Sequence, residues 1–211
     1  DTMDFVFFEI LWDRNNYLSP TIPNPVNQKG SIDIYTRSPK QFSGYLQDKM
    51  EFDSMILNAG LRIDYFNANS VYAPDPFKPT ENLSNAEGKL TISPRLGISF
   101  PITDQGIIHF SYGHFYQLPP YRYLYSNPEF EDIAAEPVYG NANLNPEKTV
   151  TYEVGLQQQL NESLAFNITG FYKDVRDLLA IQQIRISSNS IYQKYVNKDY
   201  GNIKGITFSL T

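Results

Sequence analysis

Hydrophobic and polar side chains alternate along several segments of the chain, most regularly at residues 54–66. There, Met55 and Leu57 fall on one side of an extended backbone, and Asn58 and Arg62 fall on the other. A β-strand places successive side chains on opposite faces, so this pattern predicts a strand with one apolar and one polar face. The same reasoning predicts eight strands, at about 2–12, 41–52, 54–66, 92–100, 106–116, 149–160, 163–174 and 203–210.

The connections between these predicted strands alternate between short and long. The links after the second, fourth and sixth strands are short, at Asp53, 101–105 and 161–162, whereas the links after the first, third, fifth and seventh run to roughly 25–30 residues. A compact soluble domain seldom contains several structureless loops of that length. A transmembrane barrel has short periplasmic turns and long extracellular loops. We therefore predict an all-β fold, an antiparallel up-and-down transmembrane β-barrel.

The polar face of the predicted strands carries long and charged side chains, as a water-filled lumen requires. The longest predicted strands, of about 13 residues, exceed the usual length of about 5–6 and suffice for the roughly 9–11 that cross a tilted bilayer. A β-sandwich or a soluble barrel would show the same alternation, and eight strands can also close a small barrel. The predicted lumen-facing residues are Arg62, Asp64, Arg95, Glu153 and Lys173.

Composition narrows the function classes. No stretch of 18 apolar residues occurs, which excludes a transmembrane helix but not strands that show lipid only every second residue. The net charge is −6 without a basic run, so nucleic acid is not an expected partner. The absence of cysteine excludes a disulfide scaffold and thiolate metal ligands. The 16 tyrosines and 14 phenylalanines suit strands, and tyrosine also suits a membrane interface.

The chain contains no credible catalytic set. His109 and His114 are the two histidines, and a separation of five residues on one strand places them on opposite faces, where they cannot share a metal. No Gly-x-Ser-x-Gly segment is present, so a nucleophile elbow is not indicated. We predict no enzyme activity, no metal site and no cofactor.

The connection 117–148 is the best candidate for ligand contact. Aromatic rings beside a cation and side-chain amides suit sugars, peptides or metal chelates, through stacking and hydrogen bonds. The alternative is an interface belt and packing between loops, because tyrosine collects at membrane boundaries. The candidate ligand-binding residues are Tyr121, Arg122, Tyr123, Tyr125, Tyr139, Asn141 and Asn143.

Most of the chain beyond residue 40 resembles the TonB-dependent receptor family of outer-membrane importers, especially its Bacteroidetes-like branch with a carboxypeptidase-type regulatory domain. The most telling sequences are LNAGLRIDYF at 57–66, HFSYGHFYQLP at 109–119 and LNPEKTVTYEVGL at 144–156. The other segments that carry the resemblance are 44–52, 93–101, 170–178 and 197–205.

This resemblance implies a barrel of about 22 strands with an N-terminal plug inside. The chain, residues 1–211, would then be a partial barrel domain of about eight strands from the later half, with the plug and the barrel termini absent. The implied function is energised uptake of a scarce solute, such as a siderophore, vitamin, glycan or peptide. The implied location is the outer membrane. The implied partners are outer-membrane lipid, the TonB complex through the absent N-terminal part, and a capping surface lipoprotein.

A second hypothesis is a soluble β-rich surface module that binds glycan or protein through its aromatic loop. Solubility distinguishes the two, since a barrel piece with an apolar band requires detergent and a soluble module does not.

Overall fold

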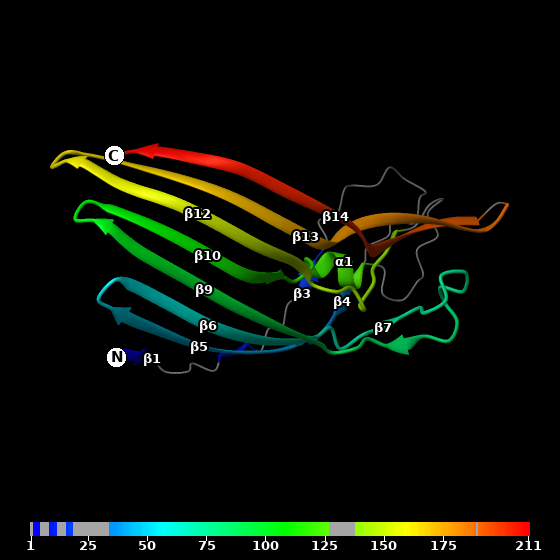
Figure 1. The fold of residues 1–211 in the computed structure, drawn as a ribbon. Helices are drawn as coiled ribbons and strands as arrows, with labels where there is room; N and C mark the ends of the chain where they lie inside the picture. The colour runs from blue at the N-terminus through cyan, green and yellow to red at the C-terminus, as the bar shows by residue number, and fades with distance from the viewer. Residues whose placement is uncertain (1, 5–8, 12–15, 19–33, 127–137, 189) are drawn as a thin grey trace.

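The computed structural model describes residues 2–4, 9–11, 16–18, 34–126, 138–188 and 190–211. Figure 1 shows that most of them form one broad sheet of long strands lying side by side. The long strands are β5 (Lys40–Phe52), β6 (Met55–Asn67), β9 (Lys89–Thr103), β10 (Gly106–Gln117), β12 (Glu147–Asn161), β13 (Leu164–Ser187) and β14 (Ser190–Leu210). The short strands are β1 (Thr2–Asp4), β2 (Glu9–Leu11), β3 (Asn16–Leu18), β4 (Ile34–Thr36), β7 (Val71–Tyr72), β8 (Ser84–Asn85) and β11 (Val138–Tyr139). The described residues also include helix α1 (Tyr121–Tyr125). No helix in this part of the chain is long and apolar enough to span a membrane.

The large sheet has the strand order β1-β5-β6-β9-β10-β12-β13-β14-β11, and β2 also pairs with β5. Each long strand is antiparallel to the next one along the chain, and β11 is parallel to β14. The predicted antiparallel up-and-down arrangement is therefore confirmed. Within the described residues β14 does not pair with β1, so the sheet is open and the alternative of a small closed barrel is not formed.

The sheet has two chemically different faces. Residues directly opposite one another on neighbouring strands share a face. Leu57 of β6 lies opposite Ile98 of β9, Ile98 lies opposite Phe110 of β10, and Phe110 lies opposite Val154 of β12. We name this side the apolar face. The other side, named the ionic face, carries Arg62, Asp64, Arg95, Glu153 and Lys173.

The turns at one end of the sheet are as short as predicted (Figure 1). Short side chains hold two of them, since the amide of Gln105 donates to Thr103 Oγ1 at 3.3 Å and the amide of Ser163 donates to Asn161 Oδ1 at 2.9 Å. Such side-chain to backbone bonds replace part of the strand ladder where the chain reverses. The opposite end carries α1, β7 and the longer connections.

The prediction of a long loop after the seventh strand is wrong. Residues 175–202 belong largely to β13 and β14, which extend to 24 and 21 residues. The pairing shifts register between Val175 and Leu178, and Asp177 has a φ of 59°. This bulge interrupts the alternation, so the sequence resembles a loop there. We name residues 178–199, beyond the bulge, the distal hairpin.

The first predicted strand, 2–12, is described only at β1 and β2. Both pair antiparallel with β5, and the rest of that segment lies outside the described residues.

The buried residues gather at the end of the sheet that carries the long connections. Ala68, Leu124 and Leu144 are 1%, 3% and 2% exposed, whereas Ile206 on the apolar face is 79% exposed. The other described sheets, β3-β4 and β7-β8, have two strands each, and the exposed side chains of the apolar face show that no second sheet covers it. This arrangement is the reverse of a β-sandwich, whose apolar faces are buried against one another.

Candidate functional site

The long connections meet in one packed group, which we name the loop cluster. It combines the ends of β6 and β8, helix α1, the segment before β12 and the distal hairpin. Its buried members are Phe66, Ala68, Ala86, Leu124, Tyr125, Ala142 and Leu144, with Leu118, Tyr121, Tyr123, Leu179 and Tyr195 packed against them. Packing between segments distant in sequence gives this end of the sheet a defined surface.

Two of the predicted ligand-binding tyrosines lie inside this end of the molecule. Tyr125 is 3% exposed, and its hydroxyl donates to the carbonyl of Ala68 at 2.7 Å. Tyr139 is also buried, with its ring centroid 5.1 Å from that of Tyr192. Both rings therefore act first as packing between connections, since a buried aromatic ring stabilises through the area that it buries.

The side-chain amides of Asn141 and Asn143, both predicted to bind ligand, form hydrogen bonds with backbone groups. Asn141 Nδ2 donates to the carbonyl of Tyr195 at 3.0 Å, and the amide of Asn143 donates to Asn141 Oδ1 at 3.1 Å. Asn143 Oδ1 accepts from the amide of Glu87 at 3.1 Å. These contacts tie three separate segments together.

The exposed part of the predicted set lies on α1. Arg122 is exposed, and its guanidinium carbon lies 4.6 Å from the centre of the Tyr123 ring. The Tyr123 ring is in turn 4.5 Å from the ring of Tyr195. Tyr121 is partly exposed and stacks with Phe66 at 6.4 Å. This surface offers a cation beside aromatic rings, which suits an anionic or aromatic ligand.

A second buried group, which the sequence pattern does not predict, is formed by Tyr139, Ile184 and Tyr192. The Tyr192 hydroxyl donates to the carbonyl of Pro76, and Lys194 Nζ donates to the carbonyl of Ala73 at 2.8 Å. These bonds join the connection after β7 to the distal hairpin. Their residues lie in the segment that was predicted to be a loop, so no periodic signal marked them.

Burial governs the titration of this second group. Burial, with smaller effects of Tyr139 and Asp75, raises the pKa of Tyr192 to about 12. Burial also lowers the pKa of Lys194 below its usual value. Both shifts are toward the neutral form, because burial disfavours the charged form in the packed connection.

The five predicted polar residues share the ionic face. Arg62 and Asp64 form an ion pair with Nη2 and Oδ1 2.7 Å apart, and Ser43 Oγ donates to the same carboxylate at 2.6 Å. This bidentate pair lies close to the loop end of β6.

The other three predicted polar residues surround a hollow of about 610 Å³ on the ionic face. The guanidinium carbon of Arg95 lies 4.8 Å from the centre of the Phe115 ring, and Nζ of Lys173 lies 5.4 Å from the centre of the Phe171 ring. Glu153 accepts a hydrogen bond from Ser111 Oγ at 3.0 Å. Glycines directly opposite Arg95, at Gly60 and Gly113, leave these long side chains room to lie along the surface.

The two histidines do lie on opposite faces, as predicted. The His109 ring covers Gly155 on the side of the ionic face. His114 Nε2 is 2.7 Å from the hydroxyl of Tyr112 on the apolar face. In the described part of the chain, no three His, Cys, Asp or Glu side chains are placed to hold a metal ion.

Comparison with known families gives one match over nearly the whole chain. The family described as "TonB dependent receptor-like, beta-barrel" matches residues 4–211.

Solved structures agree at the level of the fold. The hemophore receptor HasR of Serratia marcescens, in a complex with its hemophore and heme, is 17% identical with a TM-score of 0.65, over 83% of this chain and 32% of that one. The ferric enterobactin receptor PfeA of Pseudomonas aeruginosa is 17% identical with a TM-score of 0.62, over 88% of this chain and 26% of that one. The FrpB iron transporter of Neisseria meningitidis is 15% identical with a TM-score of 0.58, over 83% of this chain and 23% of that one. The chain therefore spans about a third or less of each of these three proteins.

Proposed function

The chain belongs to the TonB-dependent receptor β-barrel family of outer-membrane proteins, and on this premise we propose that it supplies part of the barrel and external loops of an importer for a scarce solute. The family consists of transport receptors rather than enzymes, and we extend this to the present chain, to which we assign no catalytic step. The Bacteroidetes-like branch stays a proposal, resting on the sequence motifs described above.

The observation that carries the proposal is the division of one continuous sheet into an apolar and an ionic face. The apolar face is uncovered over long strands that exceed the length needed to cross a bilayer. The ionic face carries the Arg62–Asp64 ion pair and the further charges of Arg95, Glu153 and Lys173, which a water-filled lumen solvates. Backbone groups in hydrocarbon must be satisfied within the sheet, and a barrel wall achieves this.

We propose that the missing part of the barrel closes this open sheet and that a plug domain fills the lumen against the ionic face. Transport then depends on the TonB complex, which acts on regions outside this chain. Outer-membrane lipid covers the apolar face, and a surface lipoprotein is a further candidate partner at the loop end.

The solute class follows from the relatives and from the loop chemistry. The structural relatives include receptors for a heme-carrying hemophore and for ferric enterobactin, an iron transporter and a copper transporter. We propose a solute of comparable scarcity, such as a siderophore, vitamin, glycan or peptide. Arg122 with Tyr121 and Tyr123 would contact it directly, while Tyr125, Tyr139, Asn141 and Asn143 would hold that surface in place.

Uptake by the full-length receptor tests the proposal. A Gram-negative strain that lacks its own importers would express the receptor and be supplied with ferric enterobactin, heme or Cu²⁺ as probes. We expect accumulation of at least one probe that requires both the receptor and TonB. The Arg122→Ala variant should weaken uptake without lowering receptor abundance, and Lys78→Ala, which changes an exposed cation on another connection, serves as the matched control.

The soluble binding module is the alternative that the family match does not favour. It would be supported if the full-length protein purified from the aqueous fraction without detergent. Recovery only from detergent-extracted outer membranes supports the importer.

A further inference from the structure

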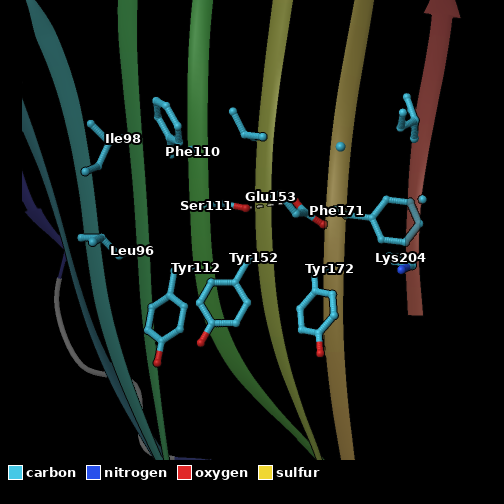
Figure 2. A pocket seen from close by; sticks show the side chains of 14 residues that line it. Leu96, Ile98, Phe110, Ser111, Tyr112, Tyr152, Glu153, Phe171, Tyr172 and Lys204 are labelled. Carbon is cyan, nitrogen blue, oxygen red and sulfur yellow. Dashed lines mark hydrogen bonds between the residues drawn. The ribbon is translucent and has the colours of Figure 1, made fainter. Parts of the chain in front are cut away.

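The apolar face carries a row of tyrosines across three neighbouring strands. Tyr112 of β10 lies opposite Tyr152 of β12, which lies opposite Tyr172 of β13. The ring centroids are 5.1 Å and 6.4 Å apart. Figure 2 shows that the three hydroxyls point the same way, away from Phe110. That direction leads along β10 toward α1 and the loop end of the sheet.

Next to this row, the apolar face has a hollow of about 850 Å³. Gly170 lies at its floor, directly opposite Val154 on one side and Ile206 on the other. A glycine there leaves a gap in an otherwise continuous layer of side chains. A Cβ atom built on Gly170 would meet no atom closer than 4.0 Å, so the gap is open space. Tyr152 and Tyr172 border the hollow at its loop end (Figure 2).

One cation lies at the same level as the tyrosine row. Lys204 of β14 is directly opposite Tyr172 and lines the same hollow (Figure 2). Its side chain is exposed, and it forms no ion pair with any residue that the structure describes. An apolar trough thus ends at three phenol hydroxyls and an ammonium group.

We propose that this trough binds one anionic, phosphorylated lipid of the outer leaflet. An acyl chain lies over Gly170 between Val154 and Ile206, and the phosphate lies at Lys204 and the tyrosine hydroxyls. Along the sheet, the apolar trough is followed by the tyrosine row and Lys204, in the same order as the acyl chain and the phosphate of a lipid. Tyrosines mark the boundary of the hydrocarbon, and a lysine extends from this boundary to the headgroups. The cation selects an anionic lipid over a zwitterionic one.

The inference rests on the proposed membrane placement of the apolar face and not on solute uptake. A receptor that accumulates its solute but lacks this lipid preference would overturn the present inference alone.

Native mass spectrometry of the full-length receptor in detergent tests the headgroup. Diphosphoryl lipid A and phosphatidylethanolamine would be titrated separately. We expect tighter binding of lipid A, with Lys204→Ala lowering that affinity by about fivefold and Lys204→Arg retaining it. Equal binding of both lipids, or an unchanged lipid A affinity in Lys204→Ala, would overturn the proposal.

A second variant tests the trough. Gly170→Leu fills the hollow, and we expect it to lower the affinity for lipid A on the order of tenfold through lost apolar contact. A Cβ atom at Gly170 has room without a clash, so the new side chain starts in open space. Gly44→Leu, on the same face of β5 opposite Ile63, is the matched control and should bind as the unmodified receptor does. Equal losses in both variants, or association of two receptor copies in place of lipid, would contradict a lipid site.

Discussion

Asn197 holds the backbone of Asn145 through both ends of its side-chain amide. The Asn145 N–H donates to Asn197 Oδ1 at 2.8 Å, and Asn197 Nδ2 donates to the Asn145 carbonyl at 3.1 Å. The same Nδ2 donates to the carbonyl of Asp177 at 2.7 Å. Asp177 is the left-handed residue of the bulge between Val175 and Leu178. One side chain therefore joins the end of the connection before β12 to the bend at which the distal hairpin begins.

Removing this side chain should loosen the joint locally. Asn197→Ala deletes hydrogen bonds to two segments, and a net loss of about 1.5 kcal/mol corresponds to roughly tenfold faster opening. Hydrogen exchange of the full-length receptor, followed at residues 141–148, measures the change.

Asn202→Ala is the matched control for the joint, because Asn202 is an exposed asparagine of the same strand, opposite Asp174. Its exchange pattern should stay close to that of the unmodified receptor. Equal acceleration by both variants would show that the Asn197 contacts do not hold the joint.

The stability of the loop cluster should depend both on the hydroxyl of Tyr125 and on its packed ring. Tyr125→Phe removes the bond to the carbonyl of Ala68, the buried residue after β6, which we expect to cost about 1–2 kcal/mol. Tyr125→Ala also removes the packed ring, for a cost of about 3–5 kcal/mol. The free energy of local opening, measured by hydrogen exchange at α1, should follow that order. The control Tyr200→Phe changes a tyrosine that is 80% exposed, and it should leave the free energy of local opening at α1 unchanged. Equal effects of the two Tyr125 variants would contradict a role for the hydroxyl.

The sequence predicts the sheet well because a sheet with one apolar and one polar face leaves a periodic signature. The predicted strand at 54–66 corresponds to β6, Met55–Asn67, and the division into polar and apolar faces follows from the same alternation. The distal hairpin lacks that signature. Its side chains contact other connections, as Tyr195 does with Tyr123 and Lys194 with Ala73, and the bulge at Asp177 breaks the register.

The loop contacts could not be predicted for a different reason. The bond from Tyr125 to Ala68 spans 57 residues, and that from Tyr192 to Pro76 spans 116 residues. Such pairs have no fixed spacing, so one sequence contains no pattern that would reveal them. From the sequence, both tyrosines are equally compatible with ligand contact and with packing. Only the three-dimensional arrangement of the segments distinguishes the two roles.

The second buried group should give the receptor an alkaline transition. The pKa of Tyr192 is raised from 10.0 to about 12, so the neutral form stabilises the fold. This contribution is complete below about pH 10 and is lost as the pH rises through about 12. Absorbance of tyrosinate should therefore show a late component that is missing in Tyr192→Phe. The control Tyr200→Phe should keep this late component. If Tyr192→Phe titrates as the unmodified receptor does, the late component does not belong to Tyr192.

Two glycines on neighbouring strands should respond in opposite directions to the same substitution. A Cβ at Gly155 of β12 would lie 2.3 Å from the His109 ring, whereas a Cβ at Gly170 of β13 would meet nothing closer than 4.0 Å. Gly170→Ala should raise stability by about 0.4–1 kcal/mol, because alanine restricts the unfolded chain. Gly155→Ala should lower stability by about 1–3 kcal/mol, because the ring must leave its position over the glycine.

The unfolding midpoint of the full-length receptor in detergent measures both changes in stability. In the His109→Ala background, the cost of Gly155→Ala should fall by at least about half. A cost that is unchanged in that background would show that the ring does not set the preference for glycine.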